Sequence, residues 1–162
     1  MGISFGPKIT LNPDIIERLV TLGKTALESN DVPVAALLIY DGAVIGEGYN
    51  TVLWDGNAAG HAEINAITAA LQSIGHDRFL SLDRSKLMLI STFEPCLMCV
   101  GAILNHNIRT VCYLQEKNFD ERMMERKKLA KYYLLRRQAH HNNEQIELFR
   151  LHPEYKNQPN AK

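Results

Sequence analysis

Two apolar runs joined by a tight-turn dipeptide constrain the fold more than any other feature. Val34 to Tyr40 is a continuous apolar run that is too short for a helix with a full amphipathic face. Asp41-Gly42 follows it, a dipeptide typical of two-residue turns, and Ala43 to Tyr49 forms the second run. This arrangement predicts a β-hairpin in the first third of the chain.

Helical and strand patterns alternate along the rest of the chain. Apolar residues at helical spacing predict helices, and short apolar runs without such a stripe predict strands. A first helix is expected to begin at Asn12-Pro13 and to stop at Asn30-Asp31. The later helices are expected at 61–74, 95–104 and 119–139, and the later strands at 87–91, 110–114 and 145–151.

This order of elements predicts an α/β fold. We expect a three-layer α/β/α sandwich, in which a five-stranded mixed sheet lies between two layers of helices. About 30 residues, including the expected helix 119–139, connect the last two strands, so this pair is expected to be parallel. A length of 162 residues suits one domain, expected at 1–152, with a polar tail at 153–162.

Charge and cysteine content argue against several classes of protein. The 18 Lys and Arg residues balance the 18 Asp and Glu residues, which disfavours a protein that coats nucleic acid by bulk charge. Three cysteines are an odd number and do not suggest a secreted disulfide framework. No apolar signal core and no long apolar run are present, so we expect a cytoplasmic protein without a membrane partner.

Two short segments combine residues that bind a metal with one that moves a proton. His61-Ala62-Glu63 offers an imidazole and a carboxylate, and Pro95 to Cys99 offers two thiols three residues apart. A catalytic zinc keeps three protein ligands and a water, and His61, Cys96 and Cys99 supply three ligands. Glu63 could take a proton from that water and return it as an acid. We therefore predict one zinc ion per chain, with a catalytic water.

Each segment has a simpler explanation when it is taken alone. A C-x-x-C pair can also be a redox pair, a structural zinc site or buried core, and a structural site needs a fourth Cys or His. Cys112 falls within an expected strand and is expected in the core, and His106 is expected at the surface. The conjunction of the two segments, about 30 residues apart with a strand between them, favours a zinc hydrolase.

The same segments resemble a known signature. H-A-E followed by P-C-L-M-C is similar to the signature of zinc-dependent nucleobase deaminases. Residues 31–36, 46–50, 60–64 and 92–103 resemble bacterial tRNA adenosine deaminases and small guanine deaminases of the cytidine/deoxycytidylate deaminase superfamily. The resemblance covers roughly residues 13–115. It implies a homodimeric hydrolase that releases ammonia from a purine-type nucleobase or nucleoside.

The resemblance also implies roles for individual residues. His61, Cys96 and Cys99 would be the zinc ligands, and Glu63 the proton shuttle. The positions that would contact the substrate are Asn50, the backbone of Ala62, and the pocket walls Val34 and Phe93. Asn50 could instead be a turn residue, and the two apolar side chains ordinary core.

Other parts of the chain depart from the family pattern. Trp54 lies in the loop before His61, where it could stack on a base or cover the edge of the core. A long charged helix is expected in place of a Gly- and Ala-rich stretch after the fourth strand, and the basic helix that follows the last strand of the tRNA-acting members is not expected in the residues after that strand. RNA is therefore a less favoured partner than a small nucleobase or nucleoside. A cytosine or cytidine deaminase, a tRNA adenosine deaminase and an inactive zinc-containing nucleic-acid-binding protein stay as alternatives.

The charged helix has two explanations of its own. Residues 117–137 hold eight Lys or Arg and three Asp or Glu. They would form either a solvated helix face with local ion pairs or a basic surface for a phosphate or a nucleic-acid strand.

Overall fold

The computed structural model describes residues 9–137 and 142–153 of the chain. The chain divides into two compact units, residues 1–125 and residues 126–162. The first unit contains α1 (Pro13–Leu27), β1 (Ala35–Tyr40), β2 (Ala43–Tyr49), α2 (Ala62–Ile74), α3 (His76–Ser81), η1 (Arg84–Lys86), β3 (Leu87–Phe93), α4 (Leu97–Asn105) and β4 (Thr110–Gln115). Helix α5 (Phe119–Leu135) begins in the first unit, and α6 (Asn142–Leu151) belongs to the second.

The first unit is built on a mixed four-stranded sheet in the order β2-β1-β3-β4. Strand β1 pairs antiparallel with β2 and with β3, and β3 pairs parallel with β4. The predicted hairpin is confirmed, with Tyr40 opposite Ala43. Asp41 and Gly42 have φ values of 49° and 83°, and this pair of positive angles is what a two-residue turn between twisted strands requires.

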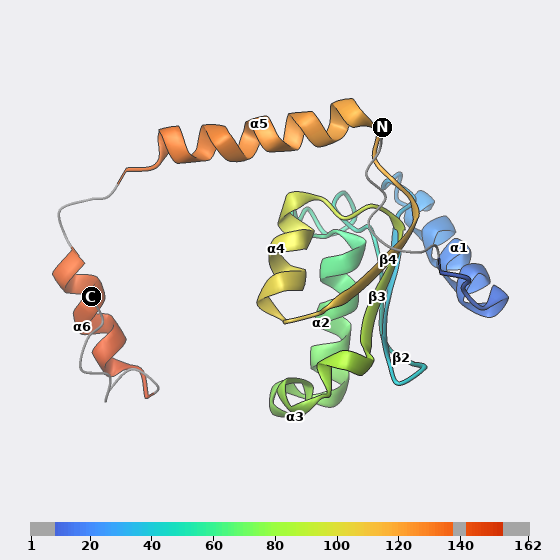
Figure 1. The fold of residues 1–162 in the computed structure, drawn as a ribbon, viewed down its shortest axis with the longest axis horizontal. Helices are drawn as coiled ribbons and strands as arrows, with labels where there is room; N and C mark the ends of the chain where they lie inside the picture. Colours follow the sequence, from blue (N-terminus) through green and yellow to red (C-terminus); the bar gives the residue numbers. More distant parts are fainter. Residues whose placement is uncertain (1–8, 138–141, 154–162) are drawn as a thin grey trace. The chain divides into compact units, whose positions relative to one another are not determined.

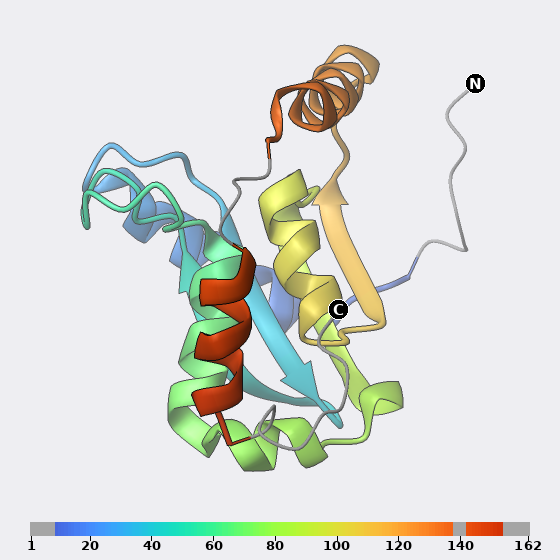
Figure 2. The same cartoon turned by 90° about the vertical axis from the view of Figure 1, so that its left-hand side faces the viewer.

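Helices cover both faces of this sheet (Figure 1). Helix α1 lies on one face, where Leu19 packs with Leu37 and Ile90. Helices α2 and α4 lie on the other face, where Ile67 and Ile103 belong to the same core cluster as Leu38. Figure 2 shows α2 and α4 side by side on that face. Successive side chains of β1 point to opposite sides of the sheet, and five of its six residues are buried because helices cover both sides.

Helix α2 approaches the sheet unusually closely. A Cβ atom built at Gly46 would lie 2.2 Å from the carbonyl oxygen of Ala66, and one at Gly48 would lie 2.3 Å from that of Ala62. Only glycine in β2 leaves room for the helix backbone there. Ala62, Ala66 and Ala70 are the residues of α2 at this contact. The close packing fixes the first turn of α2 at one end of the sheet.

The predicted fifth strand is wrong. Residues 145–151 belong to helix α6, so the expected parallel pairing of the last two strands is also wrong. The parallel pair is β3 and β4, which are connected through α4. Alternation of Ile146 and Leu148 suggested a strand, but Phe149 breaks it, and the Gln, Glu, Leu and Arg residues around them are good helix formers.

Two further differences concern helix ends and short helices. Helix α5 ends at Leu135, although it was expected to extend to residue 139, and residues 138–141 lie outside the described residues. Helix α3 was not expected. The tail is described only as far as Pro153. Among the described residues, no helix is both long enough and apolar enough to cross a membrane.

Candidate functional site

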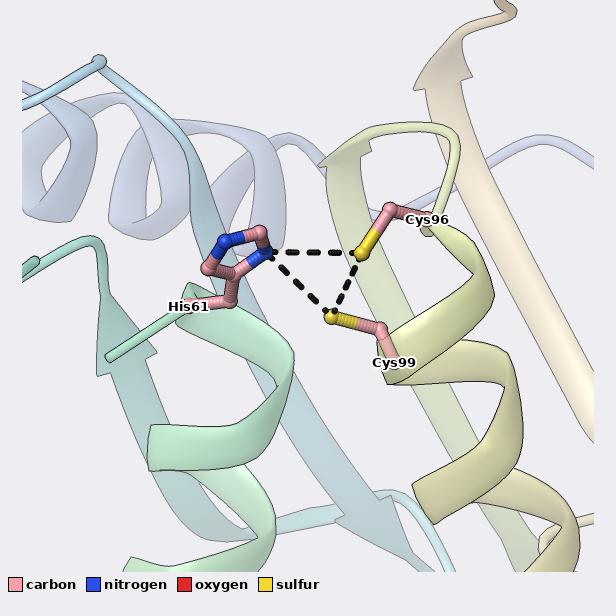
Figure 3. A group of neighbouring side chains, drawn as sticks. All are labelled: His61, Cys96 and Cys99. Atoms are coloured by element: carbon pink, nitrogen blue, oxygen red, sulfur yellow. Dashed lines mark hydrogen bonds between the residues drawn. The ribbon is translucent and has the colours of Figure 1, made fainter. Parts of the chain in front are cut away.

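Three predicted metal ligands meet where two helices begin. His61 is the N-cap residue of α2, and Cys96 is the N-cap residue of α4. The two sulfur atoms lie 3.6 Å apart, and the Nδ1 atom of His61 lies 3.5 Å from Cys96 Sγ and 3.6 Å from Cys99 Sγ. Figure 3 shows the three side chains converging from the ends of the two helices. The helices therefore bring together residues that are far apart in the sequence.

These distances fit a zinc ion. With Zn–S bonds of about 2.3 Å and a Zn–N bond of about 2.05 Å, tetrahedral angles place two sulfurs about 3.8 Å apart and sulfur about 3.6 Å from nitrogen. The three ligand atoms lie close to this spacing. Two thiolates and an imidazole form a typical donor set for zinc, and three ligands leave one position open.

The two thiols differ in acidity. The pKa of Cys96 is lowered to about 5 by a hydrogen bond with the Cys99 sulfur and by hydrogen bonds from the backbone N–H groups of Cys99 and Met98. The pKa of Cys99 is raised by its hydrogen bond with the Cys96 sulfur, by burial and by the nearby carboxylate of Glu63. The helix end thus already stabilises one thiolate, and a bound cation would favour loss of the second proton.

Glu63 lies next to these ligands and is buried. It is the second residue of α2, only 4% of its surface is exposed, and its Oε2 atom lies 3.4 Å from Cys99 Sγ. Burial raises the pKa of Glu63 above the ordinary value of a glutamate. A carboxyl group with a raised pKa can take up and release a proton closer to neutral pH, which suits a general acid and base.

A cavity of about 470 Å³ opens beside these residues. This volume is in the range of sites for small ligands, and most of the wall is apolar. The residues that line it are Asn30, Asp31, Val32, Val34, Asn50, Val52, Leu53, His61, Glu63, Phe93, Glu94, Cys96 and Lys117. Six of the nine residues predicted for the site are among them.

The other three predicted residues do not line the cavity. Cys99 and Ala62 are fully buried next to His61 and Cys96, which do line it. The side chain of Trp54 is 73% exposed, which does not fit the alternative that it covers the edge of the core. Asn50 lines the cavity, and its backbone N–H donates to the carbonyl oxygen of Val34.

Asp31 is a cavity residue that the sequence analysis treated only as a helix stop. Its carboxylate is buried and accepts hydrogen bonds from the backbone N–H groups of Leu53 and Trp54, at 2.8 Å and 3.1 Å. The Ser29 hydroxyl donates to it as well. Asp31 therefore fixes the loop after β2, from which Val52 and Leu53 line the cavity. The only signal for this role was its place in the segment 31–36 that resembles the family.

Lys117 is the second residue that was missed. It follows β4, it is only 7% exposed, and its Nζ atom donates to Glu125 at 2.6 Å and to the carbonyl oxygen of Pro95 at 2.8 Å. Its backbone N–H donates to Glu94, which also forms an ion pair with Arg122. Residues 117–125 thus hold the two residues directly before Cys96. A single lysine after a strand gave no local signal for this contact.

Lys117→Met is expected to lower the free energy of unfolding by about 3 kcal/mol, because it leaves the carboxylate of Glu125 without its buried partner. Urea unfolding measures the change. Arg18→Gln is the matched control. It breaks the exposed ion pair with Glu47 and is expected to cost less than about 1 kcal/mol. Equal effects of the two substitutions would show that Lys117 contributes no more than a surface charge.

Comparison with known proteins identifies the family. The fold and the three-ligand site define a zinc-binding α/β domain with a buried carboxylate. Residues 12–115 match the family described as the cytidine and deoxycytidylate deaminase zinc-binding region, and the chain belongs to this family. The match confirms the resemblance drawn from the sequence and the expectation of zinc as the cofactor.

Individual relatives agree with the family match. A tRNA-specific adenosine deaminase from Buchnera aphidicola subsp. Schizaphis graminum is 34% identical over 88 residues, which cover 54% of this chain and 55% of that protein. A tRNA-specific adenosine deaminase 2 from Xenopus tropicalis is 38% identical over 93 residues, which cover 57% of this chain and 55% of that protein. The chain therefore spans about half the length of the curated relatives it matches.

Solved structures show the same fold. A structure from a study of tRNA:A34 deaminases superposes with a TM-score of 0.57 at 31% identity, over 64% of this chain and 76% of that one. A guanine deaminase from Bacillus subtilis gives a TM-score of 0.56 at 33% identity, over 65% of this chain and 66% of that one. Both similarities agree with the α/β architecture and the mixed sheet of the first unit.

Proposed function

We propose that this protein is a zinc-dependent hydrolase that deaminates a nucleobase or nucleoside of the purine type and releases ammonia. The observation that carries the proposal is the buried carboxylate of Glu63 beside a three-ligand metal site that borders a cavity. A purely structural zinc site would use a fourth protein ligand and would have no use for this carboxylate.

The residues of the site have separate roles in this reaction. His61, Cys96 and Cys99 would hold the zinc ion. When bound, zinc supplies hydroxide near neutral pH, because it lowers the pKa of water to about 7. Glu63 takes a proton from the attacking water and gives it to the leaving amino group, so that water is consumed and ammonia leaves.

The cavity walls would orient the substrate. Val34 and Phe93 would provide apolar surfaces for a flat ring, and the side-chain amide of Asn50, another residue of the cavity lining, would bind a polar group of that ring. The backbone of Ala62 would bind the edge of the base. These roles follow the family pattern. Similarity to proteins named for adenosine and guanine deamination favours a purine over a cytosine or cytidine substrate.

A screen for released ammonia tests the proposal. The zinc-loaded protein is incubated with adenine, guanine, cytosine, their nucleosides, triazines, pterins and a tRNA anticodon stem. We expect ammonia from at least one purine compound, and none after zinc is removed with a chelator. Release from cytosine or cytidine alone would contradict the purine assignment. A fourth protein ligand, detected by X-ray absorption of the bound zinc, would contradict the enzyme assignment.

Assembly as a homodimer stays a prediction.

A further inference from the structure

The loop between β2 and α2 connects two residues of the site. It follows Asn50, which is buried in the cavity wall, and it leads to His61, one of the three candidate metal ligands. Residues 51–60, all of which the structure describes, form no helix or strand, so hydrogen bonds determine their shape. The two ends of the loop meet, because the backbone N–H of Thr51 donates to the carbonyl oxygen of Gly60 at 2.8 Å. A group that holds these ends therefore controls the positions of both site residues.

Asn65, a residue of α2, holds both ends of this loop. Its side-chain Nδ2 atom donates to the carbonyl oxygen of Tyr49 at 2.8 Å and to Oγ1 of Thr51 at 3.0 Å. The same nitrogen lies 3.5 Å from the carbonyl oxygen of Gly60. One amide group thus contacts the residues on both sides of Asn50 and the far end of the loop.

Position 65 needs a side chain that donates hydrogen bonds. The carbonyl oxygens of Tyr49 and Gly60 can only accept, and the hydroxyl oxygen of Thr51 accepts here as well. An amide NH2 group has two hydrogens and supplies both of the shorter bonds, whereas an aspartate would face the same oxygen atoms with a carboxylate. Thr51 is buried, so loss of the donor would leave buried polar groups without a partner, which is costly.

These contacts fix the backbone around Asn50 on three sides. Its own N–H donates to the carbonyl oxygen of Val34 at 3.0 Å, and Asn65 holds the residue before it and the residue after it. A side chain that binds a substrate has to keep its position within about 0.5 Å, which requires support from a surrounding layer of hydrogen bonds. Asn65 itself does not line the cavity. Any effect it has on a bound substrate is therefore exerted through its neighbours.

We propose that Asn65 is a positioning residue that sets Asn50 against the substrate and His61 against the metal. Asn65 lies one turn after His61 on α2, and its backbone N–H donates to the carbonyl oxygen of His61 at 2.9 Å. Its side chain thus ties the loop to the helix that begins at the metal site. The role toward Asn50 rests on the proposed function, whereas the role toward His61 needs no turnover.

Competition with a chelator tests the role toward His61 on the full-length protein. Asn65→Leu keeps the approximate shape of the side chain and removes the donor. It is expected to lower zinc affinity about 10-fold, as for other residues that support a metal ligand. Gln72→Met is the matched control, because it removes an exposed amide further along α2 and should leave zinc affinity unchanged. Equal zinc affinities of Asn65→Leu and the parent protein would overturn this role.

Steady-state ammonia release from guanine or adenosine, with zinc in excess, tests the role toward Asn50. Asn50→Ala is expected to raise KM about 30-fold and Asn65→Leu about 10-fold, with little change in kcat, because each loses a hydrogen bond that orients the substrate. The double variant should raise KM no more than Asn50→Ala alone, since both residues act on one contact. Effects that multiply would overturn the proposal, because Asn65 would then act without Asn50.

Thr51→Val keeps the proposal testable if Asn65→Leu folds poorly. It removes one acceptor and leaves the bond from Asn65 to Tyr49, so KM should rise only about 3-fold while the Tm stays near that of the parent protein. Changes in KM that follow Tm across the variants would show a merely structural role and overturn the proposal. If no purine compound releases ammonia from the parent protein, the proposed function fails, and the zinc affinities alone then decide this inference.

Discussion

Glu63→Gln is expected to retain zinc and to lower the rate of ammonia release by a factor of 10²–10⁴, the usual contribution of a positioned proton-transfer group. Glutamine has nearly the shape of glutamate and can stay hydrogen-bonded beside Cys99, so the three metal ligands should keep their positions. It cannot take up a proton from water. The loss should therefore appear in kcat, with zinc content unchanged at one ion per chain.

The control for this substitution is Glu17→Gln. Glu17 is an exposed glutamate on α1, so its replacement makes the same change of charge away from the cavity. It should leave both zinc content and kcat unchanged. If Glu63→Gln kept its rate within a factor of about ten, the proton shuttle would have to be another group. If the Glu63→Gln variant lost zinc as well, the carboxylate of Glu63 would be supporting the metal ligands rather than moving a proton.

The candidate metal ligands, which the structure brings together, could be predicted from the sequence because their signals are local. His61 and Glu63 lie in one turn of α2, and Cys96 and Cys99 in one turn at the start of α4. The i,i+3 spacing of Cys96 and Cys99 puts both sulfur atoms on one side of the helix. The hairpin was equally local, since Asp41-Gly42 can adopt the two positive φ angles that the turn needs.

The parts that were missed depend on contacts between distant segments. Whether residues 145–151 form a strand depends on a neighbouring strand, and without that pairing their helix propensity decides. Lys117 reaches Pro95 only because β4 lies parallel beside β3, so that both strands end at the same edge of the sheet. Asp31 meets the loop after β2 for a similar reason. None of these contacts leaves a pattern in its own segment.

The same distinction applies to the basic segment at residues 126–137. The charge of this segment could be counted from the sequence. Its two explanations, a solvated helix face with local ion pairs and a basic surface, make opposite predictions for ion pairing. A solvated face with local pairs would place a carboxylate beside the cations, whereas the segment 126–137 contains none. The charged pairs of α5 lie before it, where Glu125 contacts Lys117 and Arg122 contacts Glu94. The first turns of α5 therefore support the cavity wall. Among the described residues, the cations of its later turns form no salt bridge.

Cys96→Ala is expected to reduce zinc affinity at least 100-fold, because it removes one of three ligands, a larger loss than the 10–100-fold typical of residues that only support a ligand. Zinc per chain after dialysis, and competition with a chelator, measure the effect. Cys112→Ala is the matched control. Its thiol is half-buried in β4, 3.7 Å from the sulfur of Met88, and its removal should leave zinc content unchanged.

Thermal unfolding gives this prediction a second measurement. Because an ion that binds only the folded state stabilises it, added zinc should raise the Tm of the parent protein and of Cys112→Ala, but not that of Cys96→Ala. Unchanged zinc content in Cys96→Ala would refute the ligand assignment, even if activity were lost. Loss of zinc in both cysteine variants would instead point to general damage to the sheet. Only loss confined to Cys96→Ala assigns the metal to the place where the two helices begin.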